Sequence, residues 1–250
     1  TWEEAVMSVD AGLRAIAGKY GADSILGFAS PSATNEALFL LKRYLAEQLG
    51  VSRFEFRLAG EDRTVTQEED EVLRHVDKHP NSMGAIKLGF TDETLGGIEG
   101  AIAAARSGQI KAAVIVYLKP LVCRPADAQA EAAVAQLMES LEYSVLLAAH
   151  RADWQAAANV VLPVAAWSEE EGTYTNYQGR VQLAMQAISP GGDVLPIWRV
   201  LSMLLEAGGA EPAGSSPAEI FSALAASVPA YEGIEYANTS LPGAVITSGT

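Results

Sequence analysis

The chain has 250 residues, of which 49% are hydrophobic and 19% are charged, and its formal net charge is −14 at pH 7. This balance is typical of a folded protein and excludes an intrinsically disordered chain. The excess of acidic residues argues against nucleic acid and against an anionic membrane surface as partners, because both require clustered lysine and arginine.

Cysteine and histidine are scarce. The one cysteine, Cys123, excludes an internal disulfide, a cysteine-ligated iron–sulfur cluster and a four-cysteine zinc site within this chain. His75 and His79 have the spacing of one helical face, but Pro80 follows directly, so we predict no metal site there. No apolar run reaches the ~18–20 residues that a membrane span needs. The first ten residues also lack the apolar region of a signal peptide, so we expect the cytoplasm as the compartment.

Hydrophobic periodicity and turn residues predict a regular succession of helices and strands. In chain order, the expected elements are a helix over 2–21, a strand over 24–30, a helix within 32–50 that follows serine, threonine and asparagine cap candidates and ends at Gly50, a strand over 53–58, a short helix over 66–76, a helix over 94–109, a strand over 110–118, a helix over 127–141, a strand over 143–149, a short helix over 152–158, a strand over 159–164, two short β segments within 173–187, a helix over 195–208, a linker over 208–219, a helix over 217–226 and an extended tail over 236–250.

The alternation of helices and strands with short connections is typical of a parallel sheet covered by helices. The run over 110–118 is continuous and β-branched, as expected for a central strand buried on both faces. We therefore predict an α/β fold, with a mostly parallel Rossmann-like sheet, helices on both faces and a short β excursion near 173–188. Residues 1–206 are expected to form this α/β domain, and residues 207–250 a linker, a helix and an extended C-terminal tail.

The common nucleotide and hydrolase motifs are absent from the sequence. There is no G-x-G-x-x-G fingerprint, no Walker A loop and no G-x-S-x-G elbow. The glycines of "LGGIEG" lie inside a helical pattern, so we interpret them as sites of close helix packing. We predict no catalytic residue and no metal ligand in this chain.

Three stretches nevertheless carry dense polar signals. They are "SPSATNEALFLLKRYL", in which Asn35 and Glu36 stand at a helix start, "DKHPNSMGAIKLG" over 77–89, and "AANVVLPVAAWSEEEGTYTNYQGRVQ". In the third stretch a strand ends at a proline, and a compact polar group follows. In open α/β sheets, ligands bind beyond the carboxyl ends of the strands, which is where this loop is expected.

Two interpretations of the third stretch stay open. As a turn, its glycines would allow positive φ, Asn176 would bridge the turn backbone, and Arg180 would form an ion pair with Glu169 or Glu171. As the remnant of a cofactor pocket, it would contribute polar contacts, or it could contact another subunit. The pocket candidates are Glu169, Gly172, Thr173, Asn176, Gly179, Arg180 and Gln182.

These stretches resemble the molybdopterin oxidoreductase superfamily. The family pattern Asp-Val-Val-Leu-Pro, Glu-x-x-Gly-Thr-x-x-Asn-x-x-Gly-Arg-x-Gln, Pro-x-Gly and Trp is matched by Val160, Val161, Leu162, Pro163, Glu169, Gly172, Thr173, Asn176, Gly179, Arg180, Gln182, Pro190, Gly192 and Trp198. Asn159 stands where the family usually has aspartate. The opening "TWEEA" and the stretch "SPSATNEALFLL" are also similar to family signatures. Residues 1–206 would then be a molybdopterin-oxidoreductase-like domain.

Within the superfamily, "HPNSMGAIKLGF" resembles the large iron–sulfur subunit of NADH:quinone oxidoreductase, respiratory complex I. That resemblance implies a domain that has lost its cofactor, with Fe-S clusters only in neighbouring domains or subunits. It also implies other subunits of a respiratory NADH dehydrogenase as partners, and a cytoplasmic position peripheral to the inner membrane without direct insertion. The segment between the matching stretches is much shorter here than in the family, and the cysteine-bearing cluster domains are absent.

Three functions follow from these observations. The first is a non-catalytic structural or assembly domain of the complex I peripheral arm, which would support electron transfer from NADH to quinone with no cofactor of its own. The second is a fragment of a formate-dehydrogenase-like oxidoreductase that binds molybdopterin together with partner chains. The third is a small-molecule-binding α/β domain. Fold alone does not decide between them.

Overall fold

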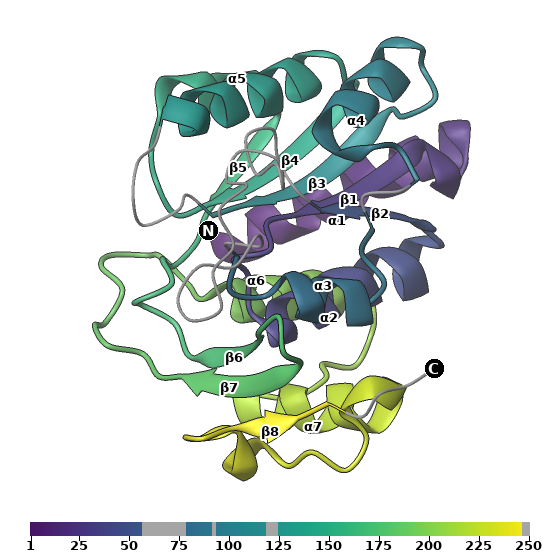
Figure 1. Cartoon of the computed structure of the whole chain (residues 1–250). Coiled ribbons are helices and arrows are strands. Elements are labelled where there is room, and N and C mark those ends of the chain that lie inside the picture. The colour runs from purple at the N-terminus through teal and green to yellow at the C-terminus, as the bar shows by residue number, and fades with distance from the viewer. Residues whose placement is uncertain (57–78, 92–93, 119–124, 247–250) are drawn as a thin grey trace.

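The computed structural model describes residues 1–56, 79–91, 94–118 and 125–246 (Figure 1). Its centre is a five-stranded, entirely parallel sheet with the strand order β2-β1-β3-β4-β5. The strands are β1 (Ile25–Ala29), β2 (Arg53–Phe56), β3 (Ala112–Tyr117), β4 (Tyr143–Ala148) and β5 (Val160–Pro163). The predicted α/β class and parallel sheet are therefore confirmed.

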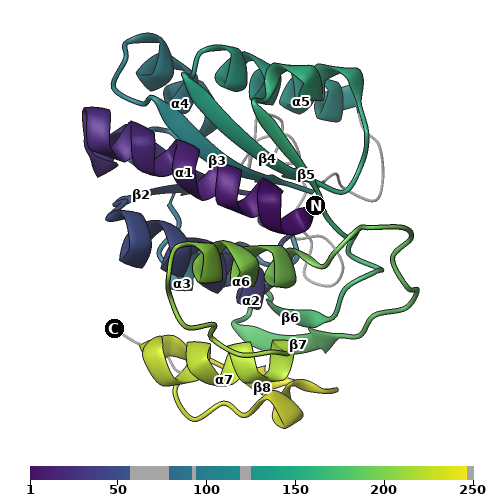
Figure 2. The same ribbon diagram turned by 180° about the vertical axis from the view of Figure 1, so that it is seen from behind.

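Helices cover both faces of this sheet (Figures 1 and 2). They are α1 (Trp2–Tyr20), α2 (Asn35–Arg43), which continues into a π-helical turn over Tyr44–Gln48, α3 (Ser82–Lys87), α4 (Gly97–Arg106), α5 (Pro125–Glu139), α6 (Ile197–Ala207) and α7 (Pro217–Ser227). Helices α4 and α5 lie on one face, and α1 and α2 lie on the other. Helix α6 forms a further layer against α1 and α2.

The central strand β3 divides its side chains between two apolar cores. Ala113 and Ile115 pack with α4 and α5, whereas Val114 and Val116 pack with α1, α2 and α6. Successive side chains of a strand point to opposite faces, and here both faces are covered. This explains why the sequence of β3 is continuously apolar instead of alternating.

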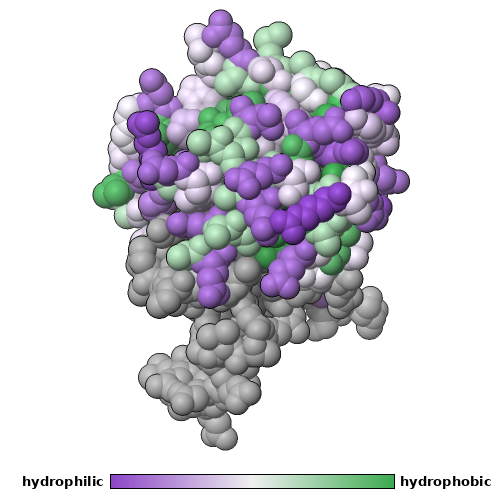
Figure 3. All heavy atoms as spheres, turned by 90° about the horizontal axis from the view of Figure 1, so that it is seen from above, coloured by the Kyte–Doolittle hydropathy of each residue, from purple (hydrophilic) through white to green (hydrophobic). Residues whose placement is uncertain are grey.

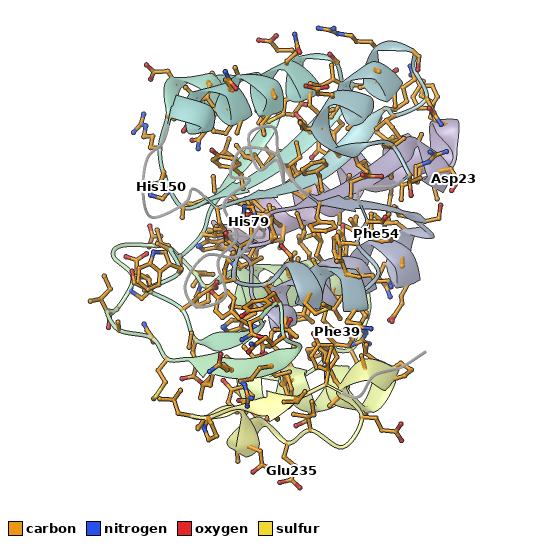
Figure 4. The ribbon with its side chains drawn as sticks, in the orientation of Figure 1. Asp23, Phe39, Phe54, His79, His150 and Glu235 are labelled. Carbon is orange, nitrogen blue, oxygen red and sulfur yellow. The ribbon has the colours of Figure 1, made fainter. Side chains whose placement is uncertain are left out.

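A second, antiparallel sheet lies below α2 and is ordered β6-β7-β8. Its strands are β6 (Gly172–Thr175), β7 (Arg180–Ala184) and β8 (Ala244–Val245). The predicted β excursion is therefore present, and the tail adds one strand to it. Helix α7 packs against α2, and Phe39 lies on the side of α2 that faces this C-terminal segment (Figure 4).

Several predicted boundaries differ from the structure or cannot be compared with it. Of the predicted cap candidates before α2, the structure uses Thr34, whose hydroxyl accepts a hydrogen bond from the Ala37 N–H, so the helix begins at Asn35. The helix predicted over 152–158 is a single 3-10 turn over Asp153–Ala157. The helix predicted over 66–76 lies outside the described residues, as does Cys123. Among the helices that are described, none has the length and apolar character required to cross a bilayer.

Candidate functional site: a buried polar seam

The three polar stretches of the sequence meet in the structure. They form a buried contact between the α/β layers and the small sheet, in the region where side chains crowd between α2 and β6 in Figure 4. We call this group the polar seam. Its members are Asn35 and Glu36 from α2, Asn81 from the residue before α3, Thr173 and Thr175 from β6, and Tyr231 from the turn after α7. All six residues are fully buried.

Strand β6 is an edge strand, and side chains of the seam pair with its backbone. The Glu36 carboxylate accepts a hydrogen bond from the Thr173 N–H at Oε2 and another from the Thr173 hydroxyl at Oε1, both at 2.8 Å. Two residues further along the strand, the Thr175 N–H donates to Asn81 Oδ1 at 2.7 Å. Edge strands otherwise present unpaired backbone groups. Helix α2 and the segment before α3 therefore take the place of a neighbouring strand.

Asn35 connects the remaining groups of the seam. Its Nδ2 donates to the hydroxyl oxygens of Thr173 and Thr175, each at 3.0 Å, and its Oδ1 accepts from the Tyr231 hydroxyl at 3.2 Å. The hydroxyls of Thr175 and Tyr231 are 2.8 Å apart. A buried polar network in which the members satisfy one another specifies one packing arrangement. The seam therefore fixes the position of the small sheet on the α/β layers.

Two glycines allow this close approach. A Cβ at Gly84 would collide with the side-chain oxygens of Asn81 and Asn35, and a Cβ at Gly172 would lie 2.6 Å from Thr34 Cγ2. Neither glycine has a positive φ, so space alone requires them. Gly172 was predicted from the sequence as a pocket residue, and the structure places it against α2.

A second buried carboxyl group, that of Glu170, lies just before β6. It is 2% exposed, and its Oε2 accepts a hydrogen bond at 3.1 Å from the N–H of Ile197, the first residue of α6. Its Oε1 finds no donor among the described residues. Glu170 was not identified from the sequence. The only sequence feature that could have pointed to it is the run of three glutamates over 169–171, and nothing in that run shows which of them is buried.

Burial raises the pKa of both carboxyl groups. The pKa of Glu36 rises to about 7, because loss of water outweighs the hydrogen bonds from Thr173 and neighbouring groups that lower it. The pKa of Glu170 rises to about 8, also through burial, and the nearby charge of Glu36 raises it further. Within the part of the chain that is described, no lysine or arginine pairs with either group. Burial therefore favours the protonated form of both carboxyl groups, and it does so more strongly for Glu170.

The turn between β6 and β7 agrees with the turn interpretation of the sequence. Asn176 Oδ1 accepts from the N–H groups of Gln178 and Arg180, both at 3.0 Å, and the Asn176 N–H donates to the Arg180 carbonyl at 2.9 Å. Gly179 has a φ of 74°, a conformation that favours glycine. The roles predicted for the glycine and for Asn176 in the turn are therefore in accord with the structure.

Replacement of the turn asparagine tests this role. The change Asn176→Ala removes the acceptor for two backbone N–H groups, so we expect the free energy of unfolding to fall by about 1 kcal/mol. Urea denaturation followed by circular dichroism would measure the change. Gln178→Ala in the same turn, at an exposed side chain, is the control and should have little effect. An unchanged midpoint for Asn176→Ala would contradict the assignment.

The predicted ion pair of Arg180 with Glu169 or Glu171 is wrong. Arg180 Nη1 lies 3.4 Å from the Pro242 carbonyl and 3.5 Å from the Gly243 carbonyl, because Arg180 begins β7 opposite β8. The two glutamates precede β6, at the other end of the hairpin. Glu169 accepts from the Ala166 N–H at 2.9 Å, and Glu171 accepts from the Tyr236 hydroxyl at 2.7 Å.

The residues predicted as pocket candidates are engaged within the chain in this arrangement. Thr173 belongs to the seam, Asn176 and Gly179 form the turn, and Arg180 and Gln182 contact the carbonyls before β8. A cavity of about 420 Å³ lies at the end of α7 beside Glu232 and Gly233, and none of the candidates lines it. These candidates therefore already have hydrogen-bond partners within the chain, and we derive no chemical step through a pterin.

Comparison with known proteins places the chain in a family. The family model of molybdopterin oxidoreductases matches residues 63–207, which is more than half of the chain. The chain is 34% identical over 137 residues to the F420-dependent formate dehydrogenase 2 subunit alpha of Methanococcus maripaludis, covering 54% of this chain and 20% of that protein. It is 32% identical over 136 residues to the F420-dependent formate dehydrogenase subunit alpha of Methanocaldococcus jannaschii, with the same coverage.

A relative with a different activity shows a similar match. The NADPH-Fe(3+) oxidoreductase subunit alpha of Geobacter sulfurreducens is 29% identical over 127 residues, covering 51% of this chain and 15% of that protein. The chain therefore spans a fifth or less of the length of these relatives. The extent of the family match decides the assignment: the chain belongs to the molybdopterin oxidoreductase family.

Proposed function

We propose that this chain is the structural α/β segment of a formate-dehydrogenase-type molybdopterin oxidoreductase, and that other parts of that enzyme complete its cofactor and substrate contacts. The observation that carries the proposal is the match to two formate dehydrogenase alpha subunits at 34% and 32% identity, within a family match over residues 63–207. These relatives favour the second of the three functions predicted from the sequence.

The geometry supports a scaffold role for the family motif in this chain. The residues of the motif connect α2, α3 and the β6–β7 hairpin through short buried hydrogen bonds. Such a network holds elements in fixed relative positions, which is what a large multidomain enzyme requires of a segment that supports a site. The chain would contribute rigidity, and the reaction would take place on neighbouring parts of the assembly.

The complex I scaffold remains the second candidate. Its support is the stretch over 79–90, which resembles the large iron–sulfur subunit of that complex and contributes Asn81 to the polar seam. In that case the partners would be subunits of a respiratory NADH dehydrogenase, and the protein would lie on the cytoplasmic side of the inner membrane. The same scaffold geometry serves either assembly, so the choice depends on the composition of the native complex.

Purification of the native assembly through a chromosomal tag on this chain tests the proposal. We expect molybdenum or tungsten and a pterin, detected by fluorescence after oxidation, together with formate-dependent dye reduction. NADH-dependent quinone reduction without these metals or pterin would favour the second candidate. An assembly with neither activity and no pterin would contradict both. The same purification from a strain with an untagged chain is the control for adventitious metal.

A further inference from the structure

Two loops next to the β6–β7 hairpin project from the body of the molecule (Figures 1 and 2). The first precedes β6 and carries Trp167, which is 48% exposed. The second follows β7 and carries Met185 and Ile188, which are 72% and 58% exposed. We call these three residues the apolar arm. Three large apolar side chains on two adjoining loops are unusual on a surface that faces water.

Backbone hydrogen bonds hold the two loops of the arm together. The Ser168 carbonyl accepts from the N–H groups of Ala187 and Ile188, at 3.0 and 3.1 Å. Nearby, the Ala165 N–H donates to the Leu195 carbonyl at 2.9 Å. Trp167 is therefore beside the segment that carries Ile188, and the arm presents its side chains from a connected backbone. A preorganised apolar surface loses less conformational entropy on binding than a free loop.

Exposed apolar residues elsewhere in the described chain include Leu241 and Val245, which are 90% and 54% exposed beside and in β8. Met7, which is 64% exposed, stands on α1 among exposed polar and acidic residues, and such single apolar residues are ordinary. The outer face of the α4–α5 layer shows hydrophilic residues spread among the hydrophobic ones (Figure 3). The arm differs from the residues around β8 in lying inside the part of the chain that matches the family model.

We propose that the apolar arm is a docking surface that inserts into an apolar groove on another domain of the same oxidoreductase. This inference rests on the proposed function. The arm lies inside the residues that match the family model, and the matched relatives are about five times as long as the aligned segment. Most of such an enzyme lies outside this segment, and the proposal is that one of its other domains packs against the arm. Exposed Asp193 near the arm and the net charge of −14 favour a groove whose rim is neutral or basic.

Site-specific photo-crosslinking in the native assembly tests the proposal. The photo-crosslinker p-benzoylphenylalanine would replace Met185 in one strain and Met7 in another, because the two methionines have similar exposure. After irradiation of the purified assembly, we expect the crosslinker at position 185 to give crosslinks to a different domain of the oxidoreductase, mapped by mass spectrometry, and the crosslinker at position 7 to give none. No crosslink from position 185, or one only to a second copy of this chain, would overturn the proposal.

A matched pair of variants gives a second readout. The double change Met185→Ser and Ile188→Ser is expected to lower recovery of the assembly with the tagged chain at least tenfold, whereas Met7→Ser leaves it unchanged. Immunoblots of the extracts should show equal amounts of the double variant and of the Met7→Ser chain. If the double variant recovers as much of the assembly as the wild type does, docking through the arm is contradicted. Failure of the proposed function is seen separately, because an assembly without molybdenum, tungsten or pterin still reports its crosslinks.

Discussion

Glu170→Gln is expected to make the protein more stable than the wild type at pH 8.5 and about equally stable at pH 5. The reason is the burial of Glu170, which raises its pKa to about 8 from the ordinary value of 4.5. Glutamine keeps an oxygen for the hydrogen bond from the Ile197 N–H and has no charge to bury. Charging an isolated buried carboxyl group is costly, and the variant avoids that cost.

The sign of the effect follows from proton binding. Between pH 4.5 and pH 8, the native state holds a proton on Glu170 that the unfolded chain has released. The free energy of unfolding of the wild type therefore falls as the pH rises through this window, and the fall ends above the native pKa. A shift of this size corresponds to about 2–4 kcal/mol, once the favourable α6 N-terminus is allowed for. The pKa of Glu36 is also raised, to about 7, so this group too lowers the free energy of unfolding as the pH rises.

Urea denaturation at pH 5, 6, 7, 8 and 9 would measure this effect. The exposed change Glu211→Gln is the control, since its carboxylate faces water and should leave the pH profile as in the wild type. If Glu170→Gln shows the same decline with pH as the wild type, the buried carboxyl group does not take up a proton on folding, and the predicted linkage is wrong.

Gly84→Ala is expected to destabilise the protein by about 3 kcal/mol, from overpacking and from loss of buried hydrogen bonds. The added Cβ would collide with the side-chain oxygens of Asn81 and Asn35. Those oxygens accept hydrogen bonds from the Thr175 N–H and from the Tyr231 hydroxyl, so one methyl group disturbs several members of the seam.

The control for this change is Gly18→Ala. Gly18 lies in α1, has no positive φ, and a Cβ there meets no atom within 4 Å. Alanine is favoured over glycine in helices by about 0.5–1 kcal/mol, so this variant should be slightly more stable than the wild type. Thermal unfolding of both variants would show opposite shifts. A stabilising effect of Gly84→Ala would mean that the side chains of the seam can shift to accept the methyl group, and that the seam does not fix the position of the small sheet.

The α/β class could be predicted because its signals are local. The apolar run of β3 and the amphipathic pattern of α6 each depend on neighbouring residues, and both elements are found within two residues of the predicted ends. The three polar stretches were identifiable, since Asn35, Asn81 and Thr173 stand in dense motifs. Their meeting was not predictable, because it depends on contacts across as many as 196 residues of sequence.

The errors at the site have physical causes. Arg180 was assigned to a glutamate because opposite charges attract, but a hairpin places residues by register, and its guanidinium reaches carbonyls before β8 instead. Glu170 was overlooked because nothing in the run of three glutamates distinguishes the one that is buried. The carboxyl group is buried, and it accepts its hydrogen bond from the first residue of α6, which lies 27 residues further along the chain. Whether any pocket candidate contacts a cofactor stays a prediction for the native assembly to test.

The sequence separation of the seam residues determines how late in synthesis the polar seam can form. Asn35 is made before its partners, which lie 138, 140 and 196 residues further on. A nascent chain can form its local helices early, but these long-range contacts come late. The seam can close only after Tyr231 has left the ribosome, so a chain interrupted earlier leaves the amide of Asn35 without its last partner. A complete polar seam is therefore possible only in a chain that has been synthesised through Tyr231.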